Sequence, residues 1–174
     1  MIDFKNISYL AQGSDDQKYI YNLLCKTAIL DILGKHDPIV VGTFPLDIHV
    51  DGSDLDIICH CTDTRNFGEY LTIHFGKYDN YKLHYPDDVN PEGVIAYFEI
   101  EGQPFEIFGQ DLPSEMQMGY MHMVAEYLLL SKYGEEFKRE VVELKKCGLK
   151  TEPAFCELLG ITGDPFAGLL EFHN

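Results

Sequence analysis

The first third of the chain shows a helical spacing of apolar residues followed by a strand spacing. Apolar positions recur every three or four residues between Ile20 and Leu30, which predicts a helix. Ser14 and Gln17 have the spacing of a capping box at its start, and Gly34 is expected to end it. A short apolar strand over residues 39–41 should follow.

A second predicted strand, from Asp54 to Cys61, has two unlike faces. Alternate residues of a strand point to the same side, so Asp54 and Asp56 share a face and lie about 7 Å apart. The opposite face is apolar throughout and is expected to pack against a helix. That apolar face consists of Leu55, Ile57, Cys59 and Cys61.

The rest of the pattern predicts a hairpin and then helices alone. Expected in order are a helix over 62–75, a strand over 81–85, and a hairpin of strands 94–101 and 105–108 with its turn at Gly102-Gln103. Ser114 with Gln117 has the form of a second capping box, opening a helix to about residue 133. The last expected elements are an amphipathic helix over 135–147 and two helices capped by Thr151 and by Asp164.

These elements predict an α/β (α+β) fold, a small, twisted mixed sheet flanked by helices with a helical C-terminal segment. The length of 174 residues suits a single domain over residues 1–174. Within it we expect a sheet-containing core at residues 1–112 and a helical extension at residues 113–174.

The charge balance limits the partners of the chain. Lys and Arg number 13 against 29 Asp and Glu, which gives a net charge of −16. Such a field repels nucleic-acid backbones, so nucleic acid is not an expected partner. The chain shows neither the layout of a signal peptide nor an apolar run long enough for a bilayer, and a cytoplasmic location without membrane contact is expected. The five cysteines are predicted to be free thiols.

Asp54 and Asp56 are candidate ligands of a hard cation. Mg²⁺ prefers carboxylate oxygens together with the phosphates of a substrate. Gly42-Thr43, directly after the first strand, provides a tight turn beside them. The combination is typical of metal-dependent phosphoryl or nucleotidyl transfer.

A third acid on a neighbouring strand is expected if two cations are to be held together. Glu106 is the favoured candidate, because it is an acid between Phe105 and Ile107 in the hairpin. Glu99 and Glu101 are the alternatives.

His122 and Glu126 lie four residues apart on one face of a predicted helix. They could line a cleft and bind an acceptor substrate. Alternatively, His122 is a buried histidine whose ring is hydrogen-bonded to Glu126 of its own helix.

The order of helix, strand, Gly-Thr loop and D-x-D strand, with an acid after the hairpin turn, resembles the DNA polymerase beta-like nucleotidyltransferase superfamily. Within it, nearly the whole chain is similar to a bacterial domain-of-unknown-function family, the one numbered 4269. The segments that carry this resemblance are VGTFPLDI, GSDLDIIC, FEIFGQ, GYMHMVAEYLLL and GDPFAGLL.

The resemblance implies a mechanism that uses Mg²⁺ or Mn²⁺ and a nucleoside triphosphate. The glycine loop would contact the nucleotide through Gly42, Thr43 and Ser53. The acids would hold the metal and serve catalysis; these are Asp54, Asp56 and Glu106. Glu106 would also orient or deprotonate the hydroxyl of the acceptor.

Three departures from the superfamily pattern stand out. Thr43 replaces the more usual Ser, and Glu106 replaces the more usual Asp, which moves its carboxylate outward by one methylene. The loop from Phe44 to Ser53 has no Lys or Arg, so the phosphate charge would be met by metal alone unless Lys77 or Lys82 reaches in.

The expected function is therefore the transfer of a nucleoside monophosphate from an NTP to a hydroxyl of a small molecule. The alternative is a catalytically silent module that keeps the fold for binding or regulation. A third hypothesis is a toxin–antitoxin-type enzyme that transfers a nucleotide onto tRNA or protein. The net charge opposes binding of the tRNA substrate.

Overall fold

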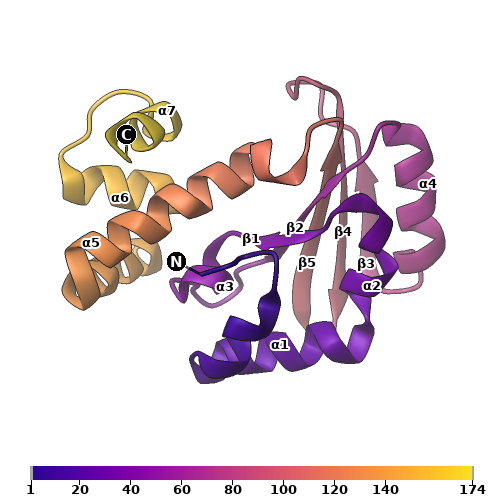
Figure 1. Ribbon diagram of the computed structural model, residues 1–174, viewed down its shortest axis with the longest axis horizontal. Coiled ribbons are helices and arrows are strands. Elements are labelled where there is room, and N and C mark those ends of the chain that lie inside the picture. The colour runs from indigo at the N-terminus through magenta and orange to yellow at the C-terminus, as the bar shows by residue number, and fades with distance from the viewer. Residues whose placement is uncertain (1, 174) are drawn as a thin grey trace.

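The computed structural model describes residues 2–173, which form a five-stranded mixed sheet with helices around it (Figure 1). The strand order is β1-β2-β5-β4-β3, with β2 parallel to β5 and the other neighbours antiparallel. The strands are β1 (Ile39–Val41), β2 (Leu55–His60), β3 (Asp79–His84), β4 (Gly93–Ile100) and β5 (Gln103–Gln110). The predicted fold class is confirmed.

Along the chain, helices come before, between and after the strands of the sheet. Those before β4 are α1 (Asp15–Thr27), α2 (Ile29–Ile32), α3 (Thr43–Leu46) and α4 (Thr64–Phe75). Those after β5 are α5 (Met118–Lys146), α6 (Thr151–Leu159) and α7 (Pro165–His173). The described residues also include three short 3₁₀ turns, Ile7–Gln12, Gly34–His36 and Ser114–Met116.

Two buried clusters lie on opposite faces of the sheet. The predicted apolar face of β2 packs in one cluster with residues of α1 and α4, such as Leu24 and Phe67. The other cluster joins Ile58 of β2 to residues of the C-terminal helices, such as Leu129 and Phe155. Figure 1 shows this division, with α5, α6 and α7 gathered on the side of the molecule away from α4. The acid-bearing face of β2 therefore looks toward the C-terminal helices.

The N-terminal helix begins as predicted but is not continuous. The Ser14 hydroxyl accepts a hydrogen bond from the Gln17 amide at 3.3 Å, and the Ser14 amide donates to the Gln17 side chain at 3.2 Å. The prediction of one helix up to Gly34 was wrong, because Ala28 adopts a left-handed conformation with φ 51° between α1 and α2. The turn there leaves Ile29 fully buried, and such burial outweighs local helix propensity.

The hairpin of β4 and β5 forms with its turn one residue earlier than predicted. Glu101 and Gly102 occupy the turn, with φ of 54° and 82°. Two successive residues with positive φ match the twist of antiparallel strands.

The second predicted capping box, Ser114 with Gln117, does not form. Ser114 instead opens a 3₁₀ turn, and its hydroxyl donates to the carbonyl of Asp37 at 2.6 Å. The side-chain nitrogen Nε2 of Gln117 donates to the carbonyls of Cys59 and Leu112, at 2.9 and 3.0 Å. Both side chains are buried, so they anchor the start of α5 to the sheet rather than cap a helix.

The C-terminal helices agree with the prediction apart from one boundary. Gly134, with φ 81° and ψ −167°, divides α5 at the expected place. Asp164 accepts a hydrogen bond from the Phe166 amide at 3.1 Å, as expected of a cap before Pro165. The start of α6 is shifted, because Lys150 occupies the cap position predicted for Thr151.

Two further findings concern the described chain as a whole. Among residues 2–173, no helix combines the length and the apolar character needed to span a bilayer. The five cysteines are free thiols, as predicted.

Replacing Gln117 by Met should destabilise the fold. The change keeps the side-chain volume but removes the two hydrogen bonds that the side-chain nitrogen Nε2 donates to the carbonyls of Cys59 and Leu112. Because a net hydrogen bond contributes about 0.5–1.5 kcal/mol, we expect urea unfolding to show a loss of roughly 1–3 kcal/mol. The exposed Gln12→Met is the matched control, and equal stability of the two variants would contradict the anchoring role of Gln117.

Candidate active site

The parallel pairing of β2 with β5 brings two of the predicted acids together. Asp56 lies directly opposite Glu106 in the register, so their side chains leave the same face of the sheet from neighbouring strands. Asp54 precedes β2 on the same side and interacts electrostatically with both. The three acids predicted from the sequence thus form one group in the structure.

Glu106 has a further neighbour that sequence reasoning missed. Tyr97 of β4 lies opposite Glu106, and its phenol acts to lower the pKa of that carboxyl group. The next strand continues the row, because Lys82 of β3 lies opposite Tyr97. Asp56, Glu106, Tyr97 and Lys82 therefore cross the sheet on one face.

The glycine loop lies against Asp56. Val41 pairs with Asp56 across β1 and β2, and Gly42 follows with φ 76°. A Cβ atom on Gly42 would lie only 2.1 Å from Oδ2 of Asp56. Glycine is therefore required here both by the backbone conformation and by the close approach of the carboxylate.

Burial and mutual repulsion make the acids costly to ionise. Burial raises the pKa of Asp56 well above its usual range, and the charges of Glu106 and Asp54 add to the effect. Burial also raises the pKa of Glu106, with Asp54 contributing and the Tyr97 phenol opposing. The pKa of Asp54 is raised by burial alone. Perturbed acids of this kind gather at functional sites.

A cavity of about 900 Å³ lies between two of the sheet acids, Asp56 and Glu106, and the C-terminal helices, while Asp54 lies outside its lining. Gly42, Thr43, Asp56 and Glu106 line it from the sheet side. The residues that line it from the helices include His122 and Glu126 of α5, Glu152 of α6 and Phe166 of α7. A cavity of this size fits a nucleotide or a small organic molecule.

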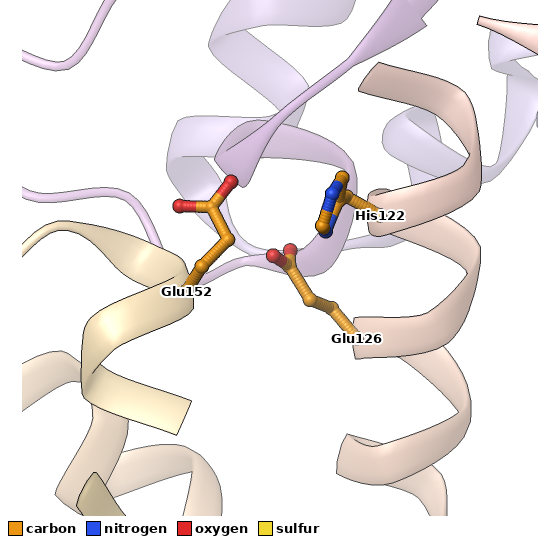
Figure 2. A group of neighbouring side chains, drawn as sticks. All are labelled: His122, Glu126 and Glu152. Atoms are coloured by element: carbon orange, nitrogen blue, oxygen red, sulfur yellow. The ribbon is translucent and has the colours of Figure 1, made fainter. Parts of the chain in front are cut away.

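His122 and Glu126 line the cavity as the cleft hypothesis expected. The alternative, a histidine hydrogen-bonded to Glu126, is wrong: both ring nitrogens of His122 are buried without a hydrogen-bond partner among the described residues. Burial lowers the pKa of His122, while Glu152 and Asp164 oppose the shift. Figure 2 shows the His122 ring and the carboxylates of Glu126 and Glu152 directed toward a common space.

Two lysines of the helical segment provide positive charge that sequence reasoning did not place at the site. Lys145, in the last turn of α5, is only 8% exposed and interacts with the charges of Asp56, Glu126 and Glu152. Burial lowers the pKa of Lys145 and those three carboxylates oppose the shift. Lys150, at the cap of α6, lines the cavity. No local signal marks either residue, because each reaches the site through the packing of α5 and α6.

The other sequence candidates lie outside the cavity lining. The Ser53 hydroxyl accepts a hydrogen bond from the Val50 amide at 3.0 Å and so closes the loop before β2. Glu101 is in the hairpin turn, and Glu99 lies opposite Pro104. Lys77 lies over the ring of Tyr78, 5.2 Å from its centre.

Comparison with solved structures supports the same fold at low sequence identity. The polymerase core of TRAMP, an RNA surveillance complex, aligns with a TM-score of 0.54 and 14% identity over 94% of this chain and 50% of its own. Cid1, described by its RNA terminal uridylyl transferase activity, aligns with a TM-score of 0.51 and 12% identity over 76% of this chain and 40% of its own. Cid1 in complex with its short product ApU aligns with a TM-score of 0.51 and 12% identity over 83% of this chain and 47% of its own. The chain thus spans half or less of each of these solved structures.

Sequence comparison assigns the family. No curated protein sequence matches the chain significantly. Residues 22–172, which include the glycine loop, the three sheet acids and the C-terminal helices, match a described protein family. The fold is shared with the polymerase core of TRAMP and with Cid1, and the chain belongs to the family described as Domain of unknown function (DUF4269).

Proposed function

We propose that the chain transfers a nucleoside monophosphate from an NTP to a hydroxyl group of a small molecule. The observation that carries the proposal is the pairing of Asp56 with Glu106 beside Gly42, all three lining one cavity. The fold adds support, because it is shared with nucleotidyltransferases.

The sheet acids fit a divalent cation such as Mg²⁺ or Mn²⁺. Asp54, Asp56 and Glu106 converge, yet none of them has a lysine, arginine or histidine nitrogen within 4.0 Å among the described residues. Asp56 and Glu106 are partly buried and Asp54 is exposed. Carboxylates that converge without a counter-ion suit a hard cation, which removes their mutual repulsion. When bound, such an ion would neutralise the charge that develops on the phosphates during transfer.

The transfer requires a base near the acceptor hydroxyl. A bond forms between the acceptor oxygen and the α-phosphorus, the bond from that phosphorus to pyrophosphate breaks, and the hydroxyl proton must leave. Glu106 is the candidate to accept that proton, and its raised pKa moves it closer to the working range of a general base. Tyr97 lies opposite Glu106 on the next strand and favours the ionised form of its carboxyl group.

The phosphates would face positive charges and hydrogen-bond donors from several elements. Gly42 and Thr43 would face them from the loop, and Thr43 keeps the hydroxyl that the superfamily pattern requires. Lys145 and Lys150 from the helical side supply the positive charge that the loop lacks. Lys82 is a further candidate, because it leaves the same face of the sheet two strands from Glu106.

A small acceptor suits this chain better than RNA. The similar solved structures are described as acting on RNA, but this chain spans half or less of their length. Its net charge of −16 opposes a polyanionic partner. The helical wall of the cavity is itself acidic through Glu126 and Glu152.

Transfer predicts release of pyrophosphate. With Mg²⁺ or Mn²⁺, an NTP and a panel of hydroxylated small molecules, the wild type should release pyrophosphate, and Asp56→Asn should be slower by at least about 100-fold, the usual cost of losing a charge-stabilising group. A short RNA in the panel tests the nucleic-acid alternative. Asp51→Asn, an exposed acid in the adjacent loop, is the control.

Thermal unfolding separates the remaining outcomes of that experiment. In the presence of Mg²⁺, adding ATP or CTP should stabilise the wild type by about 2–4 kcal/mol beyond Mg²⁺ alone at nucleotide concentrations far above Kd, and should give no such gain in Asp54→Asn/Asp56→Asn. Stabilisation without pyrophosphate release from any acceptor would favour the silent binding module. Equal stabilisation of the wild type and the double variant would show that Asp54 and Asp56 do not hold the metal ion.

Gly42→Ala should disable the site through contact with Asp56. The added methyl group meets the Asp56 carboxylate and displaces it, in addition to straining the backbone at φ 76°. Gly52→Ala is the matched control, because Gly52 has φ 81° and open space around its Cβ position. Both variants should lose about 1 kcal/mol of stability to the positive φ, and Gly42→Ala should lose more because of the contact with Asp56. Only Gly42→Ala should lose metal–nucleotide stabilisation and pyrophosphate release; parallel losses in both would contradict the contact.

The protein without metal should lose stability as the pH rises. The native state keeps a proton on Asp56 at pH values where the unfolded chain has released it, so the free energy of unfolding falls as the pH climbs through the raised pKa. Asp56→Asn should therefore be more stable than wild type at about pH 8, by about 0.5–2 kcal/mol.

The difference should disappear near pH 4, where the unfolded Asp is itself partly protonated. Urea unfolding in chelator at several pH values measures it, and Asp51→Asn should show no such pH-dependent gain. A wild type that is more stable than Asp56→Asn at about pH 8 would show that Asp56 does not carry this penalty.

A further inference from the structure

His122 has an unusual environment for a buried histidine. The residue is 5% exposed, and neither Nδ1 nor Nε2 has a hydrogen-bond partner among residues 2–173. The ring is held edge-on against Phe166, with 5.7 Å between ring centres. Leaving two buried nitrogens unpaired costs about 1–3 kcal/mol each, which calls for a ligand at this position.

Two carboxylates face the same space as the His122 ring. Glu126 follows one helical turn later on α5 and is 3% exposed, and Glu152 approaches from the first turn of α6. One ligand atom from each of the three side chains lies within 4.8 Å of the others. Figure 2 shows the imidazole and the two carboxylates converging from the two helices.

The negative charge of this group is not compensated by contact. Among residues 2–173, no lysine, arginine or histidine nitrogen forms an ion pair with Glu126 or Glu152. Lys145 is the cation that acts on both, but it is shared with Asp56 and lies beyond ion-pair distance of them. Two carboxylates and an unpaired imidazole therefore surround a space without a positive group in it.

We propose that His122, Glu126 and Glu152 bind a divalent transition-metal ion, Zn²⁺ or Mn²⁺. An imidazole with two carboxylates is a borderline ligand set that suits these ions better than the all-oxygen coordination of Mg²⁺. Three protein ligands leave coordination positions open, and these face the cavity, because all three residues line it.

This site differs from the one formed by the sheet acids. Its ligands come from α5 and α6, whereas Asp56 and Glu106 come from β2 and β5. The two groups border the same cavity from opposite walls. The proposal holds whether or not the chain transfers nucleotides, because it rests on the geometry of His122, Glu126 and Glu152 alone.

The test uses Asp54→Asn/Asp56→Asn as background, so that binding to the sheet acids does not contribute. Mn²⁺ is the first probe, because the free thiols of the chain are soft ligands that hold it poorly. Titration of the chelator-treated protein, followed by electron paramagnetic resonance of free Mn²⁺, should show about one bound ion per chain. Zn²⁺ should compete for the same position and bind more tightly.

Adding Glu152→Gln to this background should weaken Mn²⁺ binding by at least about tenfold, since even outer-shell changes cost 10- to 100-fold. Glu157→Gln, an exposed acid of the same helix, is the matched control and should bind as the background does. His122→Gln should behave as Glu152→Gln. Because Glu152 is only partly buried, its variant is expected to fold, and circular dichroism verifies this.

Three results would overturn the proposal. One is a background variant that binds no Mn²⁺ or Zn²⁺. Another is unchanged binding after Glu152→Gln. The third is thermal stabilisation of the background by spermidine, lost in Glu152→Gln, without any bound metal, which would assign the group to an organic cation instead. Loss of nucleotide transfer alone would leave the metal site standing, so the two proposals fail separately.

Discussion

The pairing of β2 with β5 is the interaction on which the site depends. It is a parallel contact between strands separated in the chain by α4, β3 and β4, so its hydrogen bonds form only after a long loop has closed. The register of this pair places Asp56 opposite Glu106, and a shift by one residue would turn one of them to the opposite face. Burial of the apolar face of β2 against α1 and α4 prevents that shift. The core on one side of the sheet thus positions the chemistry on the other.

Local patterns were sufficient to predict the sheet half of the site. Alternation along β2 puts Asp54 and Asp56 on one face, and the structure agrees. Glu106 was recognisable because an acid between two aromatic or aliphatic residues of a strand needs a reason to be there. The glycine loop was recognisable by position, although the reason for glycine, the approach of Oδ2 of Asp56 to 2.1 Å of a Cβ position, required the coordinates. In each case the residues that form the sequence pattern lie within a few positions of the site residue that the pattern predicts.

The helical half of the site could not be predicted in the same way. Glu152 and Lys145 look like ordinary surface charges in their helices, and only the packing of α6 on α5 directs them to the cavity. Ser114 and Gln117 show the opposite error, because a good capping pattern was outweighed by buried carbonyls that needed donors. The helix break at Ala28 has the same origin. Tertiary burial decided these positions, and propensity over short windows does not contain that information.

The charges of the cavity restrict what can occupy it. Asp56, Glu106, Glu126 and Glu152 line it, and Asp54 adds to their field, whereas the lysines that act there are Lys145 and Lys150. In a region where water is displaced, an excess of negative charge raises the free energy of the native state unless a ligand brings positive charge. An NTP without a cation would add to the repulsion, and so would a carboxylated acceptor. Because Lys145 is shared among Asp56, Glu126 and Glu152, it cannot neutralise either wall by itself. The electrostatics therefore favour ligands that enter with a metal ion or with a positive group of their own, and this constraint applies to both walls of the cavity at once.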